Sequence, residues 1–105
     1  MKKAFLLKLS GNQKFKRLLG SHFKVKGLRA GLVTLKPKQE VGKHNTQNKE
    51  EALIILKGKA IVSYGRDKKI KASRHMFVFI PPRVSHNVKN SGSSNLQYVY
   101  LTALC

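Results

Sequence analysis

The chain has 105 residues, enough for one domain with a single modest core. Hydrophobic residues make up 41% and charged residues 25%, a balance typical of a globular protein rather than of a disordered chain. No apolar run is as long as a membrane span, and Lys8 interrupts the apolar residues 4–7 too early for a signal peptide. A single cysteine, Cys105, excludes an intrachain disulfide and fits a reducing compartment. We therefore expect a cytoplasmic protein with no membrane partner.

The net charge of +18 results from 22 Lys and Arg residues against four Asp and Glu residues. Such an excess attracts polyanions without sequence preference. A nucleic-acid-binding protein usually gathers its charge on one face, whereas these lysines occur in nearly every segment and no nucleic-acid-binding motif accompanies them. We interpret the charge mainly as a solvated basic surface. It could also favour an anionic ligand, and it leaves nucleic acid as an alternative partner through surface charge only.

Two short apolar runs come first in the chain, residues 4–7 and 15–19, and each fits either a strand or a helical turn. Residues 28–35 predict a strand that Pro37 ends, and residues 36–50 form a polar loop. Six further strands are predicted, over residues 52–56, 60–64, 70–72, 76–80, 84–88 and 96–103. Turn residues separate them, including Gly65-Arg66-Asp67 and Pro81-Pro82. Short strands at this spacing predict an all-β sandwich or barrel.

The polar loop and the strand after it bring together residues that can bind a metal ion. His44 precedes two of the four acidic residues, Glu50 and Glu51, by six and seven positions. Imidazole and carboxylate groups are the common ligands of transition metals in proteins. The alternative for this stretch alone is a pair of exposed glutamates ahead of a strand.

A second stretch, residues 75–90, delivers another histidine from a stiff turn. Pro81 and Pro82 fix the backbone ahead of His86, so the imidazole is presented reproducibly, as a metal ligand requires. The alternative is a histidine in a rigid turn with no partner.

Together the two stretches resemble the paired motifs of the cupin superfamily. The first family pattern is roughly G-x5-H-x-H-x3,4-E-x6-G, and His44, Glu51 and Gly58 match it. The second is roughly G-x5-P-x-G-x2-H-x3-N, which Pro81, His86 and Asn90 match in spacing. The resemblance covers about residues 28–104. Thr46 departs from it because the family usually has its second histidine there, and Lys38, His75 and Arg83 stand at family glycine positions. If the turn at Arg83 needs a positive φ, its side chain costs about 1 kcal/mol.

The resemblance implies a double-stranded β-helix, or jelly-roll barrel, with a metal site inside its mouth. The ligands carried over are His44, Glu51 and His86, and Thr46 could point inward and hydrogen-bond a metal-bound water. Two histidines and one carboxylate suit a divalent transition metal such as Fe, Mn, Ni or Zn. Strand alternation turns Glu50 away from the site. His22 and His75 lie outside the pattern, and we interpret both as structural or exposed.

Residues 28–105 are thus predicted to form the cupin barrel, and residues 1–27 an N-terminal strand or turn segment that packs on the barrel or on a dimer partner. A barrel of this size holds a small molecule rather than a polymer. Leu53, Ile55, Phe77 and Phe79 are expected to line or underlie its pocket. The sequence leaves the reaction open between an oxygenase, an isomerase, a lyase and simple ligand binding. The alternatives are a basic scaffold that binds a polyanion and a cupin that binds no metal.

Overall fold

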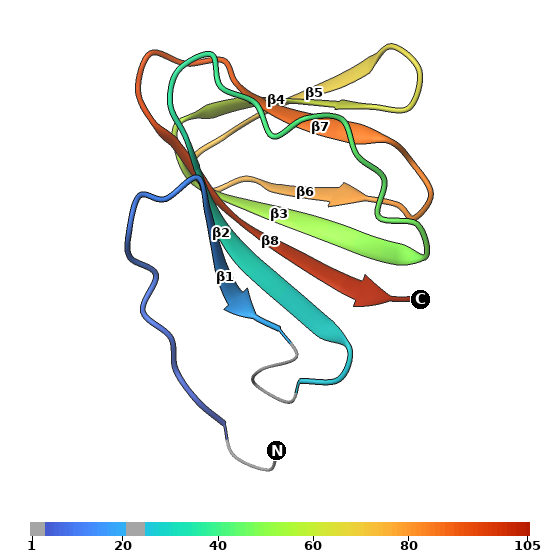
Figure 1. Cartoon of the computed structure of the whole chain (residues 1–105). Coiled ribbons are helices and arrows are strands. Elements are labelled where there is room, and N and C mark those ends of the chain that lie inside the picture. Colours follow the sequence, from blue (N-terminus) through green and yellow to red (C-terminus); the bar gives the residue numbers. More distant parts are fainter. Residues whose placement is uncertain (1–3, 21–24) are drawn as a thin grey trace.

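The computed structural model describes residues 4–20 and 25–105 and consists of strands and loops (Figure 1). No helix able to cross a membrane is found in these residues. The strands are β1 (Phe15–Leu19), β2 (Leu28–Leu35), β3 (Lys49–Lys57), β4 (Lys59–Tyr64), β5 (Lys68–Ser73), β6 (Phe77–Ile80), β7 (His86–Asn90) and β8 (Leu96–Leu104). The all-β prediction is confirmed.

The strands form two antiparallel sheets that lie one above the other in Figure 1. The large sheet has the order β1-β2-β8-β3-β6, and the small sheet has the order β5-β4-β7. One apolar core joins them, with Leu53 and Ile55 from the large sheet packed in the same cluster as Val62 and Val88 from the small sheet. This is the jelly-roll arrangement that the sequence predicts, because each sheet buries one face against the other.

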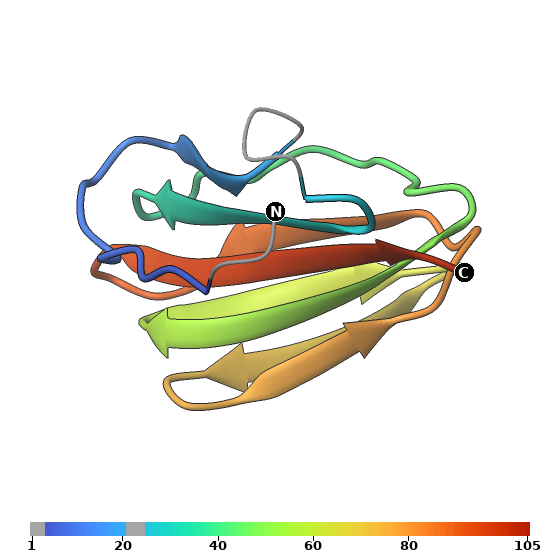
Figure 2. The same cartoon turned by 90° about the horizontal axis from the view of Figure 1, so that it is seen from below.

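Register in the large sheet decides which side chains face the core. Glu51 on β3 lies opposite Thr102 on β8 and Ile80 on β6. Alternation along β3 then places Glu51 on the same face as Leu53, and Glu50 on the other. Glu50 is accordingly exposed, whereas Glu51 is buried. Figure 2 shows β2, β8 and β3 side by side in this sheet.

The first described residues, 4–14, contain no strand, whereas residues 15–19 form β1. β1 pairs antiparallel with β2 of the same chain, with Phe15 opposite Val33, and its register shifts between Arg17 and Leu19. Part of the predicted N-terminal segment 1–27, including His22, falls outside the described residues.

The segment between β2 and β3 follows the free edge of β7. Backbone N–H groups of Lys38, Val41 and His44 donate to the carbonyls of Asn90, Val88 and His86 at 3.3, 3.0 and 2.9 Å. The loop that the sequence predicts for residues 36–50 is therefore tied to a strand over residues 38–44, and its last two residues belong to β3.

Three side-chain-bearing residues replace glycine at the family's motif positions, and all three have a positive φ. The angles are 70° at Lys38, 71° at His75 and 63° at Arg83. This backbone region is disfavoured for residues with a Cβ. The turn at Arg83 does need the conformation that favours glycine.

Candidate metal centre

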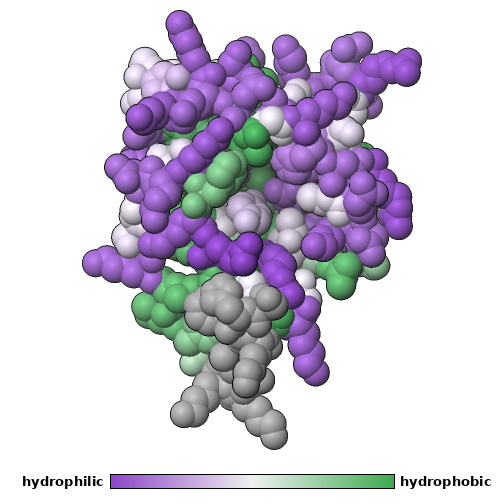
Figure 3. All heavy atoms as spheres, in the orientation of Figure 1, coloured by the Kyte–Doolittle hydropathy of each residue, from purple (hydrophilic) through white to green (hydrophobic). Residues whose placement is uncertain are grey.

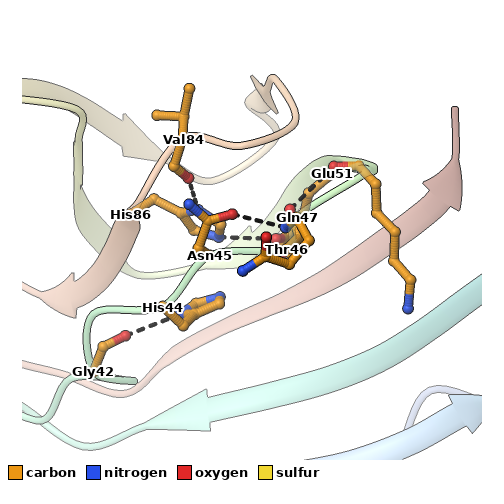
Figure 4. A network of polar contacts seen from close by, with 9 residues as sticks. Gly42, His44, Asn45, Thr46, Gln47, Glu51, Val84 and His86 are labelled. Carbon is orange, nitrogen blue, oxygen red and sulfur yellow. Dashed lines mark hydrogen bonds and ion pairs between the residues drawn. The ribbon is translucent and has the colours of Figure 1, made fainter.

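The two histidines of the motifs face each other across a short backbone bridge. The His44 N–H donates to the His86 carbonyl at 2.9 Å, and the His86 N–H donates to the His44 carbonyl at 2.8 Å. Residues that exchange both backbone bonds point their side chains to the same side. The two imidazole centroids consequently lie 4.1 Å apart, with an angle of 62° between the rings (Figure 4).

Glu51 reaches the same point from β3. Its Oε1 lies 2.9 Å from His86 Nε2, and the two side chains form a buried pair with 6% of Glu51 and 2% of His86 exposed. One possible ligand atom from each of His44, Glu51 and His86 lies within 4.8 Å of the other two. The structure thus brings together the three residues that the sequence analysis selected, from a loop, a strand and a strand start.

Backbone carbonyls orient both imidazole rings. His44 Nδ1 lies 2.9 Å from the Gly42 carbonyl, and His86 Nδ1 lies 3.0 Å from the Val84 carbonyl. A hydrogen bond from Nδ1–H to a carbonyl fixes the tautomer and leaves Nε2 available as a ligand.

This donor set fits a divalent transition metal. Two atoms bound to one ion at about 2.1 Å and at a right angle are about 3 Å apart, close to the separation of His86 Nε2 and Glu51 Oε1. Two neutral imidazoles and one carboxylate form the facial set that leaves further positions open. His44, Glu51 and His86 could therefore hold a metal ion with sites left for water or a ligand.

A cavity of about 260 Å³ is lined by two of the three residues, His44 and Glu51. Thr46 lines it as well. Its other lining residues are Phe15, Val33, Val41, Val88, Tyr98, Tyr100 and Thr102. The lining is apolar and aromatic, with four hydroxyl groups and no lysine or arginine, so it does not provide a cationic partner for an anionic ligand.

Thr46 lies in this lining, at the position where the family pattern has its second histidine. Its hydroxyl donates to the Lys49 carbonyl at 3.0 Å, which ties the residue to the start of β3. The oxygen keeps lone pairs that can accept a further hydrogen bond, for example from a water molecule. A hydroxyl that is already used in this way is a weak substitute for an imidazole ligand.

The expected pocket residues need a correction. Phe77 and Phe79 on β6 are 64% and 53% exposed, and they point away from the core, whereas Val78 and Ile80 between them are buried. A wholly apolar strand does not reveal by its pattern which face is inward. Leu53 and Ile55 are fully buried in the core cluster and share it with Val33, which lines the cavity. They lie beneath the pocket rather than in its wall.

The sequence analysis did not identify most of the residues that line the cavity. Tyr98, Tyr100 and Thr102 occupy alternate positions of β8, so strand alternation alone could have placed them on one face with Glu51. Phe15 could not be assigned because residues 15–19 fitted two structures. Asn90, which matches the second motif, is structural: its Nδ2 donates to the carbonyls of Leu35 and Ser94, and its Oδ1 accepts from Gly92 N–H.

The buried pair changes the ionisation of two groups. Burial by itself lowers the pKa of His86, but hydrogen bonds to Glu51 and to the Val84 carbonyl, with the Glu51 charge, outweigh it and raise this pKa above 6.5. Burial, together with the nearby Glu51 carboxylate, raises the pKa of Tyr98 far above its ordinary value of 10. Tyr98 therefore stays a neutral hydroxyl at any physiological pH.

Comparison with known proteins agrees with this architecture. The chain matches the M. jannaschii RmlC-like cupin family protein with a double-stranded β-helix fold at a TM-score of 0.80 and 19% identity, covering 99% of this chain and 92% of that one. A cupin protein of Bacteroides fragilis gives a TM-score of 0.82 at 17% identity, with coverage of 100% and 87%. The Schizosaccharomyces pombe Cnp3 cupin domain gives 0.78 at 19% identity, covering 87% of this chain and 64% of that chain.

At these identities the solved structures bear on the fold alone. No curated protein gives a significant sequence match. The family profile described as the cupin domain matches residues 31–102, which include both motifs and all three candidate ligands. The chain belongs to the cupin family.

Proposed function

We propose that this protein binds a divalent transition metal through His44, Glu51 and His86 and uses it to hold a small molecule in the adjoining cavity. The observation that carries the proposal is the convergence of the three ligand atoms within 4.8 Å, with His44 and Glu51 among the residues that line that cavity. The orientation of both rings by backbone carbonyls supports it, since ligands must be held rigidly to bind a metal well.

The cavity wall restricts the chemistry of the ligand. Aromatic and aliphatic side chains cover most of it, and the hydroxyls of Thr46, Thr102, Tyr98 and Tyr100 supply the polar contacts. A molecule that fits is compact, largely apolar and carries one or two oxygen atoms. Because no cation lines the wall, any negative group on the ligand would have to face the metal.

The reaction class stays open between an oxygenase, an isomerase, a lyase and simple binding. A bound metal would supply Lewis-acid polarisation or a coordination site for O₂. The cavity residues would orient the ligand and exclude water, and Tyr98, kept protonated by its raised pKa, would donate a hydrogen bond rather than accept a proton. Among the residues that line the cavity, only the candidate ligands His44 and Glu51 carry an imidazole or a carboxylate that could act as a general base.

Metal analysis of protein purified without chelator tests the proposal. His44→Ala is the most informative variant, because His44 is exposed and its loss leaves no buried charge without a partner. We expect metal affinity to fall by well over the roughly 10–100-fold that loss of an outer-shell partner costs. His75→Ala, another exposed histidine, is the matched control and should leave affinity unchanged. Wild-type protein that binds no transition metal by elemental analysis and calorimetry would instead support a metal-free cupin.

We also propose that a second copy of the chain covers the outer face of the large sheet. Two cross-strand rows on β2, β8, β3 and β6 contain only apolar residues. The first row is Leu32, Val99, Ile54 and Phe77. The second row is Ala30, Leu101, Ala52 and Phe79. Ala30, Leu32 and Val99 are already buried in a second cluster with Leu18 of β1, so the exposed part of these rows lies at β6, where Phe77 and Phe79 face solvent. In a chain of net charge +18, these uncharged rows are where two copies meet the least repulsion.

A further inference from the structure

The outer face of the small sheet is rich in lysine, unlike the apolar rows of the large sheet. Cross-strand register aligns Lys71 on β5, Ile61 on β4 and Lys89 on β7 in one row, and Lys69, Ser63 and Asn87 in the next. These positions alternate with the buried residues Val62, Ala72 and Val88. Lysines therefore stand on both flanking strands, two strand spacings or about 10 Å apart, with the smaller residues of β4 between them.

Three neighbouring hollows follow this face from one end of β4 to the other. The first and second share Ser63, Lys69 and Asn87, and the second and third share Ile61 and Ser91. Together they form a groove about 20 Å long, the length of a six-residue strand. Seven lysines line it: Lys38, Lys43, Lys59, Lys68, Lys69, Lys71 and Lys89. Hydrophilic residues cover this upper part of the molecule in Figure 3.

The lysines of this groove have little internal compensation. Its lining holds two carboxylates, Glu40 and Asp67. Glu40 Oε1 accepts a hydrogen bond from Asn87 Nδ2 at 3.2 Å, and Asp67 lies in the turn between β4 and β5. The one ion pair found among the described residues joins His86 and Glu51, so no lysine of the groove is neutralised by a carboxylate at contact distance. The positive charge is available to a partner.

We propose that this groove binds the phosphate backbone of single-stranded nucleic acid. A narrow channel between two lysine-bearing strands fits one extended polyanionic chain, whereas a duplex is too wide to enter it. Lysine contacts phosphate as a point charge and does not read bases. Tyr64, at one end, is the only Phe, Tyr or Trp among the lining residues described, and the imidazole of His86 is buried, so base stacking contributes little. The binding is therefore independent of sequence and strongly dependent on salt.

The test is fluorescence anisotropy of a labelled single-stranded 20-nucleotide DNA of mixed sequence, titrated with the full chain at several salt concentrations. The groove variant is Lys69→Gln, Lys71→Gln and Lys89→Gln, combined. The matched control is Lys8→Gln, Lys26→Gln and Lys57→Gln, which removes the same charge from exposed positions outside the groove. We expect the groove variant to weaken binding at least tenfold at about 0.1 M salt and to reduce the slope of log K against log salt by about 2. The control should change the affinity by less than about threefold.

Equal losses in the two variants would overturn the proposal, because the charge would then act only as a diffuse field. Tighter binding of a duplex of the same sequence, or of polyglutamate, than of the single strand would overturn it as well. His44→Ala should bind the single strand like wild type, so a failure of the metal proposal and a failure of this one are distinguishable.

Discussion

Three residues hold the backbone in a conformation that suits glycine better. Lys38, His75 and Arg83 each have φ between 63° and 71°. A residue with a Cβ is strained in this region by about 1–2 kcal/mol, and glycine is not. Glycine, however, makes the unfolded chain more flexible, which lowers the free energy of unfolding by about 0.4–1 kcal/mol per substitution. Strain at these positions is thus stored in loops, and the turn at Arg83 is the one that leads into His86.

We therefore predict that Lys38→Gly, His75→Gly and Arg83→Gly, combined, raise the free energy of unfolding by about 1–2 kcal/mol. For a domain of this size the midpoint of thermal unfolding should rise by about 5–10 °C, as followed by circular dichroism. Lys71→Gly, in the middle of β5, is the control and should lower the midpoint, because glycine weakens a strand interior. A lower midpoint in the triple variant would contradict the assignment of strain.

The raised pKa of His86 predicts how metal-free protein responds to pH. The folded-state pKa lies above the unfolded value of 6.5, so protonation stabilises the fold. That contribution is complete below pH 6.5 and is lost as the pH rises through the folded-state pKa. Denaturant unfolding of chelator-treated protein should show this loss, and His86→Gln should remove it, whereas His75→Gln should keep it.

Nuclear magnetic resonance titration of the His86 ring gives the direct check on the pKa. A midpoint below 6.5 in metal-free protein would refute the pairing with Glu51 as the dominant effect. In metal-loading experiments the dependence runs the other way: acid lowers metal affinity, since the proton on Nε2 competes with the ion.

At the scale of elements, β2 and β8 are fitted to each other at one glycine. A Cβ at Gly31 would overlap the ring of Tyr100, its cross-strand neighbour and a cavity residue. Gly31→Ala should therefore displace that ring and destabilise the protein by about 1–3 kcal/mol. Gly27→Ala, where a Cβ would meet nothing within 4 Å, should have little effect.

A double-mutant cycle distinguishes this steric effect from a backbone effect. Tyr100→Ala in the Gly31→Ala background should cost less than Tyr100→Ala alone, measured by denaturant unfolding. Additive losses would show that the two residues do not oppose each other.

Strand existence followed from the sequence, but strand faces did so only in part. Residues 28–35 form β2 over the predicted span, and Glu50 and Glu51 could be separated by alternation. The run 15–19 could not be assigned because its residues do not alternate cleanly between apolar and polar. Phe15 and Arg17 share one face, and Leu18 packs on the other. The register shift before Leu19 breaks the alternation further. Phe77 and Phe79 were placed wrongly because every residue of β6 is apolar. His44 and His86 could be paired only through the resemblance to the two cupin motifs, since a contact between a loop and a strand has no local signal in the chain.

At the scale of the whole molecule, the sequence distributes lysine along nearly every segment, whereas the fold separates the apolar rows of the large sheet from the lysine-rich face of the small sheet. The proposed dimer depends on that separation. Phe77→Ser with Phe79→Ser should shift a dimer to monomer in sedimentation equilibrium, because both exposed rings leave the apolar face. Leu104→Ser, which removes an exposed apolar side chain from the other face of the sheet, is the control. A wild-type chain that stays monomeric at high concentration would contradict the dimer.

The hydrogen bonds between residues 38–44 and β7 have a further consequence. An outer strand with free N–H and C=O groups is a template for pairing with another molecule, and proteins commonly cover such edges to prevent aggregation. Here the covering segment ends in His44, so the bridge that closes the edge also positions a candidate ligand. Protection against edge-to-edge aggregation and the geometry of the site are therefore coupled, and a change that loosens this loop affects solubility and metal affinity together.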